Sequence, residues 1–329
     1  MAKMLIIRFS SFGDIVQTRS VLKPLLKSGK VDQVDWLIRK DLEGAMEGEE
    51  QIGKLIGFDR KDGLLGLIAL GLHLRKEKYD YIYDAHNNMR SLVMRTVLRV
   101  LTTTPVIIRS KERFKRFLLF KFRINKFPRP YQAMKSYWGP LKKYFGIQES
   151  LSPVDWPLTL SQRVRADVEG RIILVPSAAW QMKRWPIEHW KKLIHLLPEY
   201  SFTILGGPAD DFCEDIAESD RSRVINLAGK LSLKESCTIA GHCDFIITGD
   251  TGLQQVADLS GRRGLSLMGP TAFGFVTMGT IKTLGVDLQC RPCTKDGRGK
   301  CSQDIYQKCM VEISPELVAQ EVRNLYPIV

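Results

Sequence analysis

Short apolar runs alternate with helix-like segments along almost the whole chain, and this alternation restricts the possible folds more than any other feature of the sequence. The first half contains the strand-like runs MLIIRF, VDWLIR, KLIGF, YDYIYDA and PVIIR. A second series further along contains RIILVPSA, SFTILGG, VINLAG, CDFIITGD and GLSLMGPT. Strands that alternate with helices form βαβ units, so the pattern predicts parallel sheets covered by helices.

The segment between the two series is interpreted as a linker between two domains. A chain of 329 residues is longer than one ordinary core requires and suits two domains of middling size. Residues 146–162, GIQESLSPVDWPLTLSQ, break the pattern with two prolines and several small polar residues. We therefore predict an α/β protein with two doubly wound domains, residues 1–155 and 156–329. A last helix is expected over about residues 315–326, after a cysteine-bearing loop.

The composition is typical of a folded, soluble protein. Hydrophobic residues make up 44% of the chain and charged residues 26%, which argues against disorder. The longest uncharged apolar stretch, GLLGLIALGL at residues 63–72, is too short to span a bilayer and indicates a buried or interfacial helix. Arg8 interrupts the first apolar run, so no signal peptide is recognised. We expect a cytoplasmic protein.

Positive charge is concentrated in the first half of the chain. Residues 1–150 contain 29 Lys and Arg against 15 Asp and Glu, whereas the remainder contains 20 against 21. A one-sided field of this kind attracts an anionic partner. Nucleic acid, an acidic membrane surface and a phosphorylated substrate each fit the charge alone.

The loop SSFGD follows the first predicted strand and carries Asp14. In open α/β sheets, ligands bind beyond the carboxyl ends of the strands, so a carboxylate at this point could remove a proton from an incoming hydroxyl. The alternative is that Asp14 is the N-cap of the next helix, a position that aspartate favours. The loop lacks the glycine pattern G-x-G-x-x-G, which disfavours a dinucleotide site.

Two loops of the second series have features of phosphate sites. In PSAAWQMKRWP, Lys183 and Arg184 stand just before a predicted helix, where helix N-termini bind phosphate. In GDTGLQQVAD, the tight turn at residues 249–252 offers backbone N–H groups and a hydroxyl to a diphosphate. Solvated basic residues and an ordinary capped βα turn are the structural alternatives. The run GPT at residues 269–271 ends the next strand on the same edge.

The runs RFSSFGDIVQT, PSAAWQMKRWP, LAGKLSL, GDTGLQQVAD and MGPT occur in this order over nearly the whole chain. Together they resemble the lipopolysaccharide heptosyltransferases of glycosyltransferase family 9. The resemblance implies a GT-B fold, with two facing Rossmann-like domains and the active site in the cleft. It also implies an inverting transfer of heptose, without a metal or other cofactor, from a nucleotide-diphosphate sugar that is usually ADP-heptose. The implied acceptor is the lipopolysaccharide inner core, at the cytoplasmic face of the inner membrane.

The resemblance also assigns roles to residues of this sequence. Asp14 matches the catalytic base that deprotonates the acceptor hydroxyl, and Lys183 matches the residue that neutralises the leaving diphosphate. The matching donor-binding positions are Ser177, Asp250, Thr251 and Gly252. At Gln255 this chain departs from the family, which usually has a histidine there. A glutamine can hydrogen-bond a phosphate or a sugar but carries no charge, and we include Gln255 among the donor-binding residues.

A basic segment of the first half is the candidate acceptor surface. From Lys111 to Arg129 the chain has eight basic residues and one acidic residue, interleaved with Phe and Leu. Such a segment suits an interfacial helix on anionic lipid, contacts to acceptor phosphates, or the surface of an ordinary amphipathic helix. Nucleic acid is not expected as a partner, because no nucleic-acid motif accompanies the basic run.

The run YDAHNNMRS, which ends another strand of the first series, also offers polar side chains. They fit acceptor binding and fit equally a helix cap with a solvated His86. The predicted acceptor-binding residues from both segments and from the first loop are Ser11, Gly13, Asn87, Arg90, Arg113, Lys115 and Arg116.

The four late cysteines, Cys290, Cys293, Cys301 and Cys309, begin with a C-x-x-C pair. They are considered as a structural zinc site, with free thiols in a loop as the alternative. Two other functions stay open from the residues alone. One is a GT-B transferase that uses a different nucleotide sugar, and the other is a non-catalytic basic protein that binds nucleic acid or membrane.

Overall fold

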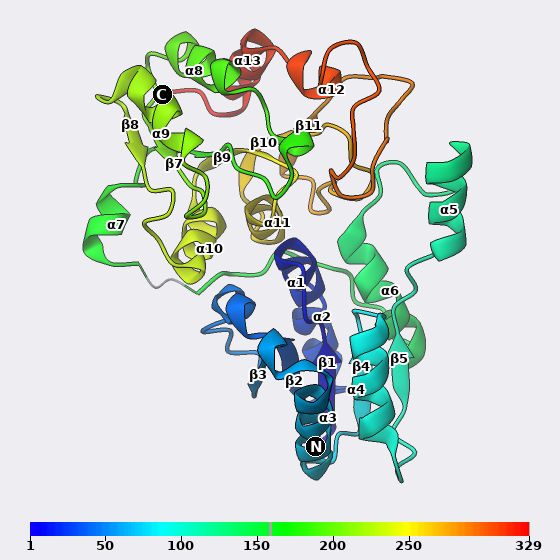
Figure 1. The fold of residues 1–329 in the computed structure, drawn as a ribbon. Coiled ribbons are helices and arrows are strands. Elements are labelled where there is room, and N and C mark those ends of the chain that lie inside the picture. The colour runs from blue at the N-terminus through cyan, green and yellow to red at the C-terminus, as the bar shows by residue number, and fades with distance from the viewer. Residues whose placement is uncertain (158–159, 329) are drawn as a thin grey trace. The chain divides into compact units, whose positions relative to one another are not determined.

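The computed structural model describes residues 1–157 and 160–328, and the chain forms two compact units, each built on one parallel sheet (Figure 1). The first unit comprises Met1–Phe114 and Met134–Val154, and the second comprises Lys115–Ala133 and Asp155–Val329. The unit boundary after residue 154 falls within the predicted linker, of which residues 158 and 159 lie outside the described part. No feature of the sequence indicated that Lys115–Ala133 groups with the second unit.

The sheet of the first unit contains five parallel strands in the order β3-β2-β1-β4-β5. The strands are β1 (Lys3–Ile7), β2 (Gln33–Arg39), β3 (Leu55–Phe58), β4 (Tyr81–Asp84) and β5 (Val106–Ile108), and each overlaps one predicted run. The helices are α1 (Phe12–Arg19), α2 (Leu22–Lys27), α3 (Gly63–Leu74), α4 (Met89–Arg99), most of α6 (Ala133–Phe145), and the 3₁₀ turns η1 (Lys40–Ala45), η2 (Arg60–Asp62) and η3 (Arg75–Glu77).

The central strands of this sheet are apolar because helices cover both of their faces. In β1, the four residues after Lys3 are all buried. Leu5, Ile7 and Leu37 join Met94 of α4 in one core cluster. Helices α3 and α4 pack against each other, and Figure 1 shows them side by side. Among the described residues, no helix combines the length and the apolar character that a membrane crossing needs.

The sheet of the second unit contains six parallel strands in the order β11-β10-β9-β6-β7-β8. The strands are β6 (Ile172–Val175), β7 (Phe202–Ile204), β8 (Val224–Asn226), β9 (Phe245–Gly249), β10 (Arg263–Leu267) and β11 (Ile281–Leu284). The sequence did not predict β11, an edge strand in which exposed Lys282 interrupts the apolar residues. The helices are most of α5 (Arg113–Phe122), α7 (Gln162–Ala166), α8 (Ile187–Leu196), α9 (Phe212–Ala217), α10 (Leu233–His242), α11 (Gly252–Leu259), α12 (Lys308–Val311), α13 (Pro315–Leu325) and the 3₁₀ turns η4 (Gln181–Lys183) and η5 (Glu218–Asp220).

Strand order determines which loops meet in each unit. Strands β1 and β4 are neighbours, so the loops that follow them lie at the same edge of the first sheet. In the second sheet, β6, β9 and β10 are consecutive, which brings together the loops that carry Lys183, Asp250 and Thr271. The carboxyl edge of each parallel sheet is therefore the place to examine for function.

Candidate functional site

Asp14 lies in the first turn of α1, directly after β1. The N-cap of this helix is Ser11, in extended backbone, and Asp14 is the third helical residue. The carboxylate Oδ2 of Asp14 accepts hydrogen bonds from the Ser11 hydroxyl at 2.7 Å and from the Ser11 backbone N–H at 3.2 Å. The interpretation of Asp14 as the N-cap is therefore wrong, although the residue does contribute to a capping box.

Three further groups hold the Asp14 carboxylate in place. The guanidinium Nη2 of Arg8 lies 2.6 Å from Oδ2, and the hydroxyl of Tyr137 donates to Oδ1 at 2.7 Å. Arg8 is buried and its Nη1 also donates to the carbonyl of Ala85, at 2.8 Å. The guanidinium carbon of Arg109 lies 3.7 Å from the centre of the Tyr137 ring. The network joins the loops after β1 and β4 to helix α6.

This network keeps Asp14 ionised at neutral pH. Burial is the largest influence on the pKa of Asp14 and raises it, but Arg8, the hydrogen bonds from Ser11 and Tyr137, and Arg109 together bring the pKa well below its usual range. The side chain is still 36% exposed. The first unit thus presents an anionic carboxylate at the carboxyl edge of its sheet.

The loop after β4 places the predicted acceptor residues in different surroundings. Asn87 has a left-handed backbone, with φ 49°, and its side-chain amide donates to the carbonyl of Arg109 at 2.9 Å. Arg113 donates to the carbonyl of Asn87 at 3.2 Å. Arg90 lies exposed in the first turn of α4. The structure therefore gathers Asn87 and Arg113, whereas Arg90 makes no comparable contact with the residues that the structure describes.

His86, in the same loop, is not the solvated histidine that the sequence allowed. It is buried, and its ring packs edge-on against Phe9, which follows β1. Desolvation is the main reason that the pKa of His86 falls to about 3, with Arg8 and Lys111 lowering it further. Its Nδ1 has no hydrogen-bond partner among the described residues. His86 is therefore a neutral imidazole packed beside the Asp14 network.

In the second unit, Lys183 and Asp250 come together as an ion pair. Lys183 ends η4, after β6, and its Nζ lies 3.1 Å from Oδ2 of Asp250, after β9. The hydroxyl of Thr271, after β10, donates to the same oxygen at 2.7 Å. Both charged side chains are largely buried, at 12% and 16% exposure. Three loops that the sequence marked separately thus form one charged cluster.

The N-terminus of α11 is beside this cluster. Thr251 is the N-cap and its hydroxyl accepts from the backbone N–H of Gln254 at 3.1 Å, while Gly252 is the first helical residue. Ser177 lies half-buried in the loop after β6. Backbone N–H groups at a helix start favour an anion. The structure therefore brings Asp250, Thr251 and Gly252 together with Lys183, and their binding of the donor stays a prediction.

Gln255 has a different environment. It is 2% exposed, and its Nε2 donates to the carbonyl of Gly274 at 3.1 Å, beside a matching bond from Gln254 at 3.0 Å. The Oε1 atoms of both glutamines have no hydrogen-bond partner among the described residues. The side chain of Gln255 ties the 270–278 loop to α11, and a direct contact between Gln255 and the donor stays a prediction.

Two loop glycines that the sequence did not single out enclose the ion pair. A Cβ on Gly274 would collide with the carboxylate of Asp250. Gly297, in the cysteine-bearing loop, has a left-handed φ of 94°, and a Cβ there would lie 2.6 Å from Cγ and Cδ of Lys183. Isolated glycines in irregular loops carry no sequence signal of such close approach, which only the tertiary structure reveals.

The sequence left the late cysteines open as a structural zinc site or as free thiols in a loop. In the part of the chain that the structure describes, no group of three or more His, Cys, Asp or Glu side chains is placed to hold a metal ion. All four cysteines, Cys290, Cys293, Cys301 and Cys309, are free thiols. Cys309 packs into the main core of the unit, and burial is the largest of the causes that raise its pKa to about 11, with smaller contributions from Cys293 and Cys290.

Comparison with known proteins identifies the family. The family model of glycosyltransferase family 9, described as heptosyltransferase, matches residues 67–306. The chain belongs to glycosyltransferase family 9. The matched range includes the whole Lys183, Asp250 and Thr271 cluster, and the predicted resemblance is confirmed.

Relatives within glycosyltransferase family 9 are distant. Lipooligosaccharide heptosyltransferase 2 of Haemophilus influenzae is 27% identical over 150 residues, which cover 44% of this chain and 43% of that protein, so the match spans less than half of that relative's length. Lipopolysaccharide heptosyltransferase 1 of Campylobacter coli is 25% identical over 291 residues, or 82% of this chain and 84% of that protein.

A solved structure confirms the fold. ADP-heptose LPS heptosyltransferase II of E. coli superimposes with a TM-score of 0.73 at 18% identity, covering 98% of this chain and 98% of that one. The predicted GT-B fold, with two Rossmann-like parallel-sheet domains, is therefore correct for this family 9 chain.

Proposed function

We propose that this chain is an inverting, metal-independent glycosyltransferase that moves a heptose from ADP-heptose to the inner core of lipopolysaccharide. Family membership, the name of the Campylobacter coli relative and the name of the E. coli structure support heptose, ADP and lipopolysaccharide as the chemistry. The observation that carries the proposal is the pair of charged groups at the two carboxyl edges, the ionised Asp14 in one unit and Lys183 beside a helix N-terminus in the other.

Asp14 is the proposed general base. The acceptor hydroxyl gives its proton to the Asp14 carboxylate while its oxygen forms a bond to the anomeric carbon of the heptose. The bond from that carbon to the diphosphate breaks at the same time, and attack from the opposite side inverts the configuration. A general base works best with a pKa near the operating pH, so a substrate that displaces the Arg8 or Tyr137 contact would increase the basicity of Asp14.

Lys183 and the N-terminus of α11 are the proposed partners of the leaving diphosphate, whose oxygen receives the electron pair. A positive charge already held in a largely buried position needs no reorganisation when the negative charge develops. Thr251 and Gly252 offer backbone N–H groups and Thr251 a hydroxyl to the phosphates. Asp250 holds the Lys183 ammonium until the diphosphate arrives, and Ser177 completes the proposed donor-binding set.

The anionic acceptor and the membrane surface are the proposed partners of the basic segment. Helix α5 exposes Phe114, Phe117 and Phe122 at 71%, 53% and 56%, and lysines and arginines alternate with them. Exposed phenylalanines among basic side chains suit the headgroup layer of an anionic membrane. We place the enzyme in the cytoplasm, peripheral on the inner face of the inner membrane. Ser11, Gly13, Asn87, Arg90, Arg113, Lys115 and Arg116 are the proposed acceptor contacts.

A second candidate is a GT-B transferase that uses another nucleotide sugar. The observation that favours it is Gln255, which stands where the family usually has a histidine. Thermal stabilisation by ADP-, GDP- and UDP-sugars separates the two candidates, since a ligand that binds only the folded state raises the melting temperature.

The direct test is a donor-by-acceptor assay with purified core-truncated lipopolysaccharides, read by mass increase. Addition of one heptose from ADP-heptose, absent in Asp14→Asn, is the expected result. A chain that transfers no sugar from any of these donors to any of these acceptors contradicts the proposal.

A further inference from the structure

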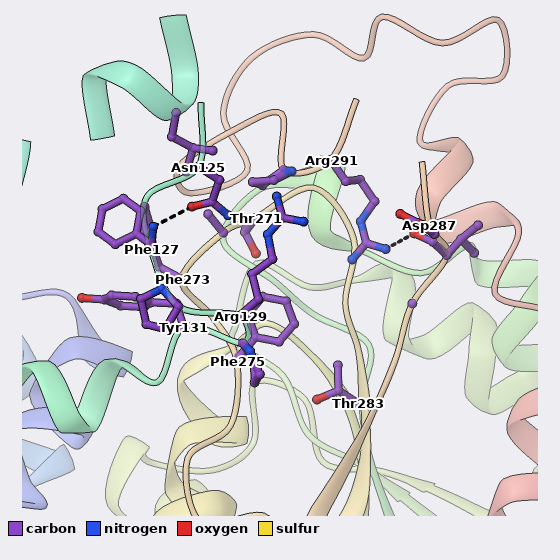
Figure 2. Close-up of a pocket in the computed structure, with 17 residues that line it drawn as sticks. Asn125, Phe127, Arg129, Tyr131, Thr271, Phe273, Phe275, Thr283, Asp287 and Arg291 are labelled. Atoms are coloured by element: carbon purple, nitrogen blue, oxygen red, sulfur yellow. Dashed lines mark hydrogen bonds between the residues drawn. The ribbon is translucent and has the colours of Figure 1, made fainter. Parts of the chain in front are cut away.

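The second unit contains a cavity of about 510 Å³, and none of the proposed donor-binding residues lines it. It lies between the segment that follows α5 and the loops that follow β10 and β11 (Figure 2). Its volume is within the range of about 300–1,000 Å³ that is typical of small-molecule sites. Residues 125–131 form one side of the cavity, and residues 271–275 and 283–292 form the other.

Aromatic side chains form a fixed wall of this cavity. The rings of Phe127, Tyr131 and Phe273 meet edge to face, with centroids 4.9–5.3 Å apart. Phe127 and Tyr131 are buried and belong to a small core with Leu119. Edge-to-face contacts and burial together keep the rings in position, so the wall is preformed.

Two guanidinium groups, those of Arg129 and Arg291, line the same cavity, together with the carboxylate of Asp287. Arg129 is exposed, and Figure 2 shows its side chain between Tyr131 and Phe273 on one side and Arg291 on the other. Within the described residues, neither Arg129 nor Arg291 forms an ion pair. The guanidinium of Arg291 donates to three backbone carbonyls, those of Met268, Gly269 and Val286. The cavity lining therefore carries two guanidinium groups against one carboxylate, and this excess of positive charge favours an anion.

The remaining polar groups suit hydroxyls. Asp287, Thr283 and Asn125 also line the cavity. The carboxylate of Asp287 accepts hydrogen bonds from hydroxyls, and a threonine hydroxyl both donates and accepts. Aromatic rings pack against the apolar C–H faces of sugar rings. We propose that this cavity is a binding site for a sugar that carries a phosphate or carboxylate group, with the anion on Arg129 and the sugar ring against the aromatic wall.

The cavity adjoins the charged cluster within the same unit. Thr271 lines the cavity, and its hydroxyl donates to Asp250 at 2.7 Å. Thr271 would therefore stand between a sugar bound here and the Lys183 and Asp250 pair. Resting on the proposed function, the inference is that the anionic sugar belongs to the acceptor glycan, so the cavity selects acceptors by their charged sugar.

Binding to the full chain is measured by titration calorimetry and ligand-observed NMR, with glucose 6-phosphate and galacturonic acid as charged probes and glucose and inorganic phosphate as controls. We expect the charged sugars to bind more tightly than either control. Arg129→Ala should weaken them about 10- to 100-fold, because it removes a charge-assisted hydrogen bond. Arg129→Lys should retain part of the affinity. Arg165→Ala removes an exposed positive charge elsewhere in the unit and should bind like the parent chain.

Three results would each overturn the proposal. Glucose could bind as tightly as glucose 6-phosphate, inorganic phosphate could bind as tightly as glucose 6-phosphate, or Arg129→Ala could leave the binding of charged sugars unchanged.

Enzyme kinetics distinguish a failure of the sugar site from a failure of the proposed function. Arg129→Ala should raise KM for a charged acceptor about tenfold and leave kcat and the donor KM within twofold. Normal acceptor kinetics in Arg129→Ala, with transfer abolished in Asp14→Asn, defeats the sugar site alone. Charged-sugar binding in a chain that transfers no heptose defeats the transferase alone.

Discussion

Replacing Gly297 by alanine tests whether the cysteine-bearing loop positions Lys183. Gly297 has a φ of 94°, and a Cβ there would lie 2.6 Å from both Cγ and Cδ of Lys183 and 3.1 Å from Cβ of Trp180. Carbon atoms in contact ordinarily stand about 3.5–4.0 Å apart, so the Lys183 stem must move by about 1 Å. The same stem carries the Nζ that lies 3.1 Å from Asp250.

Gly299 provides the matched control, because it lies in the same loop with a φ of 115° and a Cβ there would meet nothing within 4 Å. Alanine in left-handed backbone costs roughly 1–2 kcal/mol at either position. Only Gly297→Ala adds the contact with Lys183. A charged hydrogen bond contributes about 1.5–3 kcal/mol, which corresponds to about 10- to 100-fold in rate.

The assay measures kcat and KM with saturating acceptor, together with the melting temperature. We expect Gly297→Ala to lose about 10- to 100-fold in kcat/KM for the donor, while Gly299→Ala keeps parental kinetics and both variants melt at similar temperatures. In a Lys183→Ala background, Gly297→Ala should have no further kinetic effect, since the side chain that it displaces is gone. Equal kcat/KM values for the two alanine variants would refute a positioning role for Gly297.

Three further predictions concern other parts of the chain. Tyr137→Phe removes the hydrogen bond to Oδ1 of Asp14, so the pKa of Asp14 should rise. The acid limb of the profile of kcat/KM against pH should then move to higher pH. An acid limb that does not move contradicts the role of Tyr137 in lowering the pKa of Asp14. Burial raises the pKa of Asp258 to about 6, above its ordinary value, so ionisation of Asp258 lowers the stability of the fold as pH rises from about 4 to 6. In thermal melts, the stability of Asp258→Asn relative to the parent should therefore be higher at pH 7 than at pH 4.5. A difference that does not change with pH contradicts this prediction. Phe117→Ser should reduce co-sedimentation with anionic phospholipid vesicles several-fold, whereas Leu65→Ser, which removes a still more exposed apolar side chain on α3, should not. Equal losses would remove α5 as the membrane contact.

The sequence predicted most of the fold because buried parallel strands leave a strong local signal. Each of the ten predicted runs overlaps one strand, since residues such as Ile6 or Ile247 are covered on both sides and must be apolar. The missed strand, β11, is at a sheet edge, where exposed Lys282 removes that signal. The grouping of Lys115–Ala133 with the second unit depends on Phe127 and Tyr131 packing against Phe273, a contact between residues more than a hundred positions apart.

For the site, the residue types and their positions after strands indicated Asp14, Lys183 and Asp250 from sequence alone, because loops at the carboxyl edge of parallel strands follow directly from the strand order. Tertiary structure alone decided the partners of these residues. It placed buried Arg8 and Tyr137 on Asp14, set Asp250 and Thr271 around Lys183, and buried Gln255 under the 270–278 loop. A local pattern determines which element a residue joins, whereas pKa, burial and ion pairing depend on groups that only the packed fold brings within a few ångströms.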